Sequence, residues 1–180
     1  MTRSRLRAAS GGLGFVIVGG PTLVAGLVPW LITRWHADDQ LLSLRLLGGA
    51  FIAFGLLLVL EATARFALQG RGTPAPWAPP ERFVARGSYR FTRNPMYVGV
   101  LALIVGQALL LGREVLFVWA VGAWLLFQLF LLLEEEPGLR KRFGAEYEDY
   151  CLRVPRWLSI APRSHRYSRR RPGRPARRLQ

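Results

Sequence analysis

Three consecutive carboxylates, Glu134 to Glu136, close a long apolar run in the second half of the chain. They are poorly placed for stability, because the negative end of a helix dipole repels carboxylates and because membrane helices favour Lys or Arg at their cytoplasmic ends. The placement indicates that they meet a cation. The alternative is pairing with Arg140, Lys141 or Arg142 further along the same segment, which stabilises a helix by only about 0.2–0.5 kcal/mol per pair.

A second polar cluster lies upstream, around an Arg-Asn-Pro turn at residues 93–95. Pro95 fits the first turn of a helix, where its missing N–H costs nothing, and Asn94 can cap that helix. Arg93 and the free N–H groups of the helix start then form a surface that binds anions. The plainer interpretation is an N-capped membrane helix whose arginines reach the interface.

Four apolar stretches must position these clusters. A helix needs about 20 apolar residues to cross the hydrocarbon core of a membrane. The stretches cover about residues 11–33, 46–60 with an extension to about 68, 96–111 and 115–133. A soluble bundle of four buried helices is the alternative, but its helices would show a polar face at every turn. The sequence predicts an all-α, polytopic membrane protein with about four transmembrane helices.

The composition limits the class of protein further. The chain has 180 residues, 51% of them hydrophobic, with 25 Lys and Arg against 11 Asp and Glu. A nucleic-acid binder of this net charge would lack long apolar runs, and a disordered basic protein would be poor in Leu, Val and Phe. The single Cys excludes an internal disulfide and a cysteine-cluster metal site. No metal-ligand spacing is visible, so we expect no metal.

The basic residues are unevenly distributed. They lie in the N-terminal tail, between the second and third stretches and after the fourth, whereas the other two connections are almost neutral. The positive-inside rule places both termini in the cytoplasm and predicts a protein integral to the inner membrane. We expect one domain over residues 1–160 and a disordered basic tail, 161–180, against anionic lipid headgroups. RNA binding by this tail is the alternative to our expectation of no nucleic-acid partner.

Residues 112–114 alone join the third and fourth stretches, which predicts a tight helical hairpin. The chain entering the hairpin and the chain leaving it then meet on the cytoplasmic side, so the two polar clusters lie side by side. Beyond the carboxylates, apolar residues recur at helical spacing and predict a C-terminal cytoplasmic helix that rests on lipid or roofs a pocket. They are Leu139, Phe143, Tyr147 and Tyr150.

S-adenosylmethionine is a ligand that fits such a site. Its carboxylate needs Arg or free N–H groups, its ammonium needs carboxylates, its sulfonium favours aromatic faces, and its adenine needs an apolar slot. A lipid headgroup of mixed charge would make several of the same contacts.

The two clusters together resemble the integral-membrane methyltransferases grouped with isoprenylcysteine carboxyl methyltransferase and phospholipid N-methyltransferase. The resemblance covers about residues 85–158. The first motif, G-x-Y-R-x-x-R-[HN]-P-x-Y-x-G, is matched by Gly87, Tyr89, Arg90, Arg93, Asn94, Pro95, Tyr97 and Gly99. The second, E-E-x-x-L-x-x-x-F-G-x-x-Y-x-x-Y-x-x-x-V-P, is matched by Glu135, Glu136, Leu139, Phe143, Gly144, Tyr147, Tyr150, Val154 and Pro155.

The resemblance implies S-adenosylmethionine as methyl donor and a membrane lipid or prenylated small molecule as acceptor. The cofactor-binding residues that it implies are Tyr89, Arg93, Asn94, Pro95, Tyr97, Gly99, Glu135, Glu136, Leu139, Phe143 and Tyr147. For catalysis we expect Glu135 and Glu136 to hold the charged end of the cofactor and to assist deprotonation, and Arg153 or Arg93 to hold a carboxylate.

Two departures from the first motif bear on the acceptor. Position 94 is Asn where the prenylcysteine enzymes carry His, and position 88 is Ser where Pro is common, a change expected to alter only loop stiffness. The favoured function is carboxyl O-methylation of the isoprenylcysteine type. Phospholipid N-methylation is the alternative, and a non-catalytic membrane protein that binds a lipid or a partner is the other.

Glycines on the second and third stretches have two interpretations. They let helices approach closely, which we favour, or they leave room for an acyl or prenyl chain. The residues are Gly48, Gly49, Gly99 and Gly106.

Overall fold

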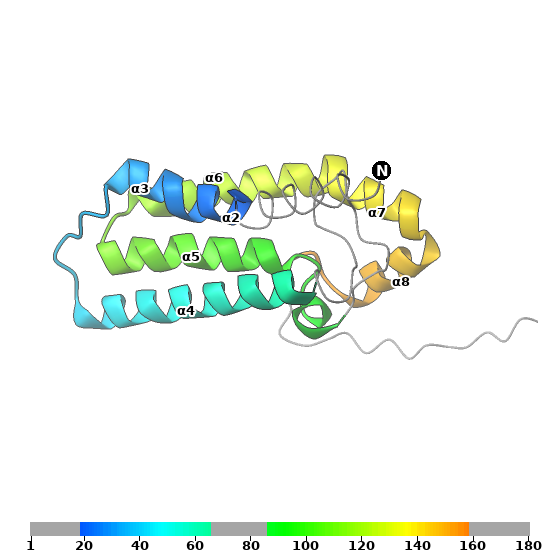
Figure 1. Cartoon of the computed structure of the whole chain (residues 1–180), viewed down its shortest axis with the longest axis horizontal. Coiled ribbons are helices and arrows are strands. Elements are labelled where there is room, and N and C mark those ends of the chain that lie inside the picture. The colour runs from blue at the N-terminus through cyan, green and yellow to red at the C-terminus, as the bar shows by residue number, and fades with distance from the viewer. Residues whose placement is uncertain (1–18, 66–85, 159–180) are drawn as a thin grey trace, which may run out of the picture.

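The computed structural model describes residues 19–65 and 86–158, and the regular elements in these ranges are all helical. Predictions for the N-terminal tail, for the connection 66–85 and for the basic tail lie outside the described residues. Long helices lie side by side along one axis, and α7 and α8 close one end (Figure 1). The elements are α2 (Gly20–Thr22), a π-helical turn (Leu23–Leu27), α3 (Val28–Thr33), α4 (Leu42–Arg65), a 3-10 turn (Gly87–Arg90), α5 (Pro95–Leu111), α6 (Val115–Phe130), a second π-helical turn (Leu131–Glu135), α7 (Glu136–Phe143) and α8 (Ala145–Arg153).

Two helices are long and apolar enough to cross a membrane. They are α4, with 24 residues, and the continuous helix Val115–Phe143, with 29 residues. Only 11% of the most apolar window of α4 is buried, and 22% of that of the second, whereas a soluble core helix would be mostly buried. The all-α prediction is confirmed for the described residues. The count of four crossings stays a prediction, because Gly20–Thr33 and Pro95–Leu111 are shorter.

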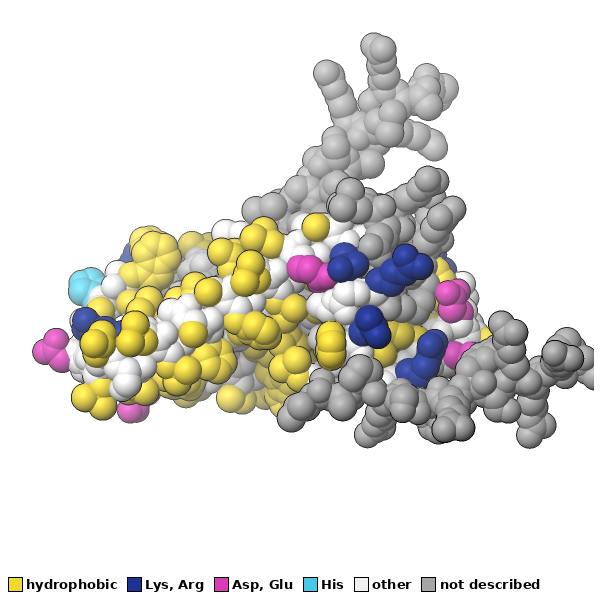
Figure 2. Space-filling model, turned by 90° about the horizontal axis from the view of Figure 1, so that it is seen from below, with side chains coloured by type: hydrophobic (Ala, Val, Ile, Leu, Met, Phe, Trp, Pro, Cys, Tyr) yellow, Lys and Arg dark blue, Asp and Glu magenta, His cyan; other side chains and the backbone are white. Residues whose placement is uncertain are grey.

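Apolar and basic side chains lie on different parts of the surface. Hydrophobic side chains cover much of the described bundle, and Lys and Arg gather toward the end that α7 and α8 occupy (Figure 2). At the other end, the connection between α3 and α4 packs on the turn between α5 and α6. There the Asp38 N–H donates to the Leu111 carbonyl oxygen at 2.9 Å, and Arg113 pairs with the Asp38 carboxylate at 3.1 Å.

The turn between α5 and α6 is the predicted hairpin. Gly112 ends α5 with a positive φ of 70°, a conformation that glycine adopts without strain. Residues 113 and 114 lead directly into α6, so the two helices run in opposite directions (Figure 1). The hairpin prediction is confirmed, and with it the juxtaposition of the segments that enter and leave it.

Glycines bring α4 and α5 into backbone contact. A Cβ atom at Gly55 would lie 2.6 Å from the Gly99 carbonyl oxygen, and one at Gly48 would lie 2.7 Å from that of Gly106. No side chain fits in such a gap. The packing interpretation is confirmed for Gly48, Gly99 and Gly106, whereas Gly49 has no neighbour within 4 Å.

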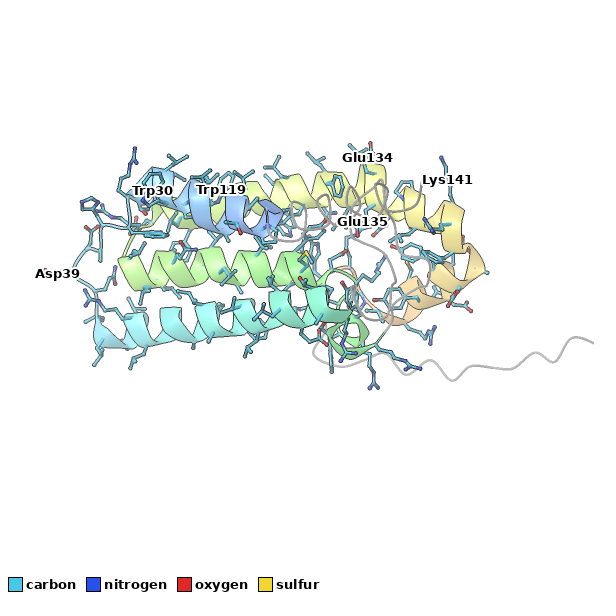
Figure 3. The ribbon with its side chains drawn as sticks, viewed as in Figure 1. Trp30, Asp39, Trp119, Glu134, Glu135 and Lys141 are labelled. Atoms are coloured by element: carbon cyan, nitrogen blue, oxygen red, sulfur yellow. The ribbon has the colours of Figure 1, made fainter. Side chains whose placement is uncertain are left out.

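One residue separates the end of each π-helical turn from a following proline. Pro29 has no N–H, so it cannot pair with the carbonyl groups one turn earlier, and its ring pushes against them. Two of these carbonyls obtain partners from other helices. Gln107 donates to the Ala25 oxygen at 2.7 Å, and the Trp119 indole donates to the Val24 oxygen at 2.9 Å. In an apolar layer, such partners replace the water that a soluble protein would use. Figure 3 shows Trp119 beside this segment.

The second π-helical turn corrects one prediction. The fourth apolar stretch was expected to end near residue 133, which would place the carboxylates at a helix C-terminus. The helix instead continues through the π-helical turn and past Pro137 to Phe143. The carboxylates therefore lie inside a helix, and the expected repulsion by a helix end does not apply.

The C-terminal apolar stripe lies on two helices instead of one. Gly144, with a φ of 49°, separates α7 from α8. The stripe still forms one cluster, because α8 folds back beside α7 (Figure 1). Its buried members are Tyr147, Tyr150 and Val154, and the partly buried side chains packed on them are Leu139, Phe143 and Cys151.

Candidate functional site

The two polar clusters meet at the start of α5. The Tyr97 hydroxyl donates to Glu135 Oε2 at 2.9 Å, and Arg93 Nη1 lies 3.2 Å from Glu136 Oε1. These contacts join residues 38 and 43 positions apart in the sequence. The tight hairpin brings them together, as the sequence predicted.

The π-helical turn decides which carboxylates face inward. Glu134 is exposed and points away from the bundle, whereas Glu135 points toward the side on which α5 lies (Figure 3). An extra residue in one turn changes the direction in which later residues face, and such turns recur at functional sites. Only part of the acidic triplet therefore belongs to the site.

Glu136 is surrounded by arginines. Arg156 binds both of its oxygens, with Nε at 2.7 Å from Oε1 and Nη2 at 3.1 Å from Oε2. Arg140 adds a contact at 3.3 Å, and Arg93 adds the contact at 3.2 Å. The carboxylate is 3% exposed, and its hydrogen bond raises the pKa of Arg156. Three guanidinium groups around one carboxylate leave two positive charges in excess, so the region attracts anions.

Glu135 is in a different position. Among the described residues it forms no ion pair, and its contact is the Tyr97 hydroxyl. The Tyr97 ring stacks on Phe127 of α6 with centroids 4.6 Å apart and planes at 19°. From the sequence we expect both glutamates to hold a cation. The structure leaves Glu135 as the carboxylate that arginines do not already bind.

Arg93 has one nitrogen to spare. Its Nη1 also lies 3.0 Å from Cys151 Sγ, while its Nε is buried without a hydrogen-bond partner in the described part of the chain. A buried donor left unpaired costs about 1–3 kcal/mol. The nitrogen itself is buried although the side chain is partly exposed, so a ligand acceptor would remove this cost only by displacing the atoms that cover the nitrogen.

Asn94 precedes α5, but its side chain does not cap the helix. Its side-chain amide donates to the Arg156 carbonyl oxygen at 3.0 Å instead, and its backbone N–H donates to the Thr92 hydroxyl oxygen at 3.1 Å. The capping prediction is wrong, because a distant segment supplies a better-placed acceptor. Pro95 occupies the first turn of α5 and is buried, as expected.

Ser88 does more than alter loop stiffness. Its hydroxyl and its N–H both donate to the Glu61 carboxylate of α4, which also binds Arg65. Proline, common at this position, offers neither donor. The contact anchors the 3-10 turn that carries Tyr89. Burial raises the pKa of Tyr89, and its carbonyl oxygen accepts from the Tyr150 hydroxyl at 2.7 Å.

Four of the other predicted cofactor-binding residues lie in packed positions. Gly99 faces α4, where an added Cβ would lie 2.7 Å from Val59 Cγ2, so packing accounts for it. Leu139, Phe143 and Tyr147 lie in the cluster between α7 and α8. Their roles in cofactor binding stay predictions.

Arg153 is exposed and donates to the Asp149 carbonyl oxygen at 3.1 Å, one turn back along α8. Arg153 is not among the arginines that bind Glu136. Arg156, three residues later, is one of them. Sequence reasoning missed Arg156 because the second motif ends at Pro155. Its position directly after that motif was the available signal.

The model of the phospholipid methyltransferase family matches residues 44–146. The chain belongs to that family. The match covers α4 except for its first two residues, and all of α5, α6 and α7, and with them Arg93, Tyr97, Glu135 and Glu136. Comparison with curated proteins and with solved structures found no similar protein. Membership of the phospholipid methyltransferase family, with the two long apolar helices, indicates a membrane-associated enzyme that transfers a methyl group.

Proposed function

We propose that this phospholipid methyltransferase family member transfers the methyl group of S-adenosylmethionine to a lipidic acceptor at the cytoplasmic face of the membrane. The observation that carries the proposal is the pairing of Tyr97 with Glu135 at 2.9 Å, beside the arginine-rich surroundings of Glu136. An amino-acid cofactor with both an ammonium and a carboxylate needs both kinds of partner within a few ångströms.

The side chains fit the cofactor. Glu135 would hold the ammonium, and the unpaired Nε of Arg93 would donate to the carboxylate. The stacked rings of Tyr97 and Phe127 offer aromatic surface to a cation. When bound, S-adenosylmethionine supplies an electrophilic methyl group, so the task of these residues is to orient and to screen charge.

Two acceptor classes are supported by different observations. The positive excess around Glu136 suits an acceptor carboxylate, which is nucleophilic as it stands and is the isoprenylcysteine type of substrate. Glu135, bound by a hydroxyl and by no arginine among the described residues, suits a phospholipid amine. An amine attacks only as the neutral base, so its proton must pass to a carboxylate before or during transfer.

The membrane arrangement is part of the proposal. In an inner-membrane protein with four crossings and both termini in the cytoplasm, the site would lie at the level of the lipid headgroups. The acceptor would then enter sideways from the bilayer. The basic tail would bind anionic headgroups. The apolar exposure of α4 and of Val115–Phe143 supports this arrangement.

The test uses the full chain in nanodiscs of total membrane lipid, with methyl-labelled S-adenosylmethionine. We expect label in the lipid fraction, much less with Glu135→Gln, and an unchanged amount with the exposed neighbour Glu134→Gln. Label released by mild alkali as volatile methanol identifies a methyl ester, and label that stays non-volatile after the same treatment identifies an N-methyl group. A purified, folded protein that neither binds the cofactor nor labels any lipid would contradict the proposal.

A further inference from the structure

After α8 ends, residues 154–157 cross from the start of α5 to α6, and we call this segment the strap. On the α5 side, the Arg93 N–H donates to the Pro155 carbonyl oxygen at 3.0 Å. On the α6 side, the Trp157 indole donates to Gln128 Oε1 at 3.0 Å. The strap is therefore bound to both helices that carry the candidate site.

Arg156 lies at the centre of the strap and makes contacts with two kinds of atom. Its carbonyl oxygen accepts from the Thr92 hydroxyl and from the Asn94 side-chain amide, each at 3.0 Å. Its guanidinium binds both oxygens of Glu136. One residue thus ties the backbone before α5 to the first residue of α7.

The form of the Glu136 contact requires a guanidinium. A forked group donates to two carboxylate oxygens at once, whereas an ammonium acts as a point charge. Arg156 is 26% exposed and Glu136 is 3% exposed, so the pair is shielded from water on one side. Two further arginines face Glu136, namely Arg93, before α5, and Arg140, one turn further along α7 itself.

We propose that Arg156 is a positioning residue, which sets the gap between the start of α5 and the acidic π-helical turn through its carbonyl oxygen and its forked contact with Glu136. The proposal rests on the proposed function, because the gap is the site assigned to the cofactor. Arg156 touches no reacting atom. It contacts Asn94 and Glu136. Through them it sets the positions of Arg93, Tyr97 and Glu135.

The kinetic test compares four variants of the full chain. Arg156→Gln removes the fork and the charge, and Arg156→Lys keeps the charge alone. Thr92→Val changes no charge but removes the hydroxyl that donates to the Arg156 carbonyl oxygen and accepts from the Asn94 N–H. Lys141→Gln is the matched charge control, because this side chain is exposed and points away from the bundle (Figure 3). We expect both Arg156 variants to lose about a hundredfold in kcat/KM, as for a displacement of about 1 Å. Thr92→Val should lose less, and Lys141→Gln none.

A second readout does not depend on activity. Cys151 is the only cysteine of the chain, and its sulfur lies 3.0 Å from Arg93 Nη1. A loosened strap opens this region more often, so Cys151 should be alkylated several-fold faster in Arg156→Gln and in Thr92→Val than in the wild type or Lys141→Gln. Thr92→Val keeps the test available should Arg156→Gln fail to fold.

The outcomes separate the two proposals. Wild-type kcat/KM in Arg156→Lys would overturn the positioning role, since charge alone would then suffice. Slowed transfer in Arg156→Gln with unchanged alkylation of Cys151 would also overturn it, because the strap would not have moved. A wild-type protein that transfers no methyl group refutes the proposed function, and the alkylation rates still decide whether Arg156 holds the strap.

Discussion

Glu136→Gln removes the charge that three guanidinium groups share. The native carboxylate is 3% exposed and contacts Arg93, Arg140 and Arg156. Removing one partner of a buried ion pair costs about 3–5 kcal/mol, and the lower end applies here because Arg140 is 49% exposed and its charge is screened. For a chain of 180 residues, about 3 kcal/mol lowers the melting temperature by about 6–12 °C.

Glu135→Gln is the matched variant one residue away. Its amide oxygen can still accept from Tyr97, so we expect a loss of stability of about 1 kcal/mol and unchanged membrane insertion. Its affinity for S-adenosylmethionine should fall about tenfold to a hundredfold, because a charge-assisted contact with the ammonium is lost. The exposed Glu134→Gln should change neither property.

The assay is thermal unfolding of detergent-purified protein, followed by tryptophan fluorescence, together with calorimetric titration of the cofactor. We expect opposite profiles, with Glu136→Gln mainly less stable and Glu135→Gln mainly weaker in binding. Melting temperatures that agree within error for these two variants would refute the division of roles. Wild-type cofactor affinity in Glu135→Gln would remove its assignment to the ammonium.

Three further predictions follow from single contacts. Gly55→Ala should separate α4 from α5 and cost about 1–3 kcal/mol, whereas Gly49→Ala, with open space around it, should be neutral or stabilising; equal melting temperatures would contradict the packing argument. Gln107→Leu should cost about 1–3 kcal/mol in thermal unfolding, because the Ala25 carbonyl loses its donor in an apolar layer; a stability equal to that of the wild type would show that this carbonyl needs no partner. Tyr97→Phe keeps the ring stack, so stability should change by about 1 kcal/mol, while methyl transfer should fall; unchanged transfer would exclude a role for the hydroxyl.

Residues that begin and end helices made α5 and the hairpin predictable. Pro95 and Gly112 bound the helix, and the observed range, Pro95–Leu111, differs from the predicted start by one residue. The meeting of the two polar clusters followed from the three-residue turn alone, without any knowledge of packing. Chain connectivity therefore accounts for the part of the site that the sequence predicted correctly.

The rest depends on geometry that a linear pattern does not contain. The fourth apolar stretch ends near residue 133 in the sequence, but the helix continues through a π-helical turn and past Pro137 to Phe143. Asn94 looked like a cap, but the Arg156 carbonyl, 62 residues away, takes its side chain. The first difference arises because a helix can continue past the end of its apolar run, and the second because tertiary packing gives Asn94 a distant hydrogen-bond partner.

The contact between α4 and α5 limits where a hydrocarbon chain can lie against the protein. Gly48 and Gly55 are seven residues apart, so the two backbones stay in touch along about 10 Å of helix. A hydrocarbon tail is wider than the space left there, and it cannot thread between these two helices over that length. Gly48, Gly99 and Gly106 therefore leave no room for an acyl or prenyl chain between these helices, and under the proposed function a lipidic acceptor would reach the site along another side of the protein.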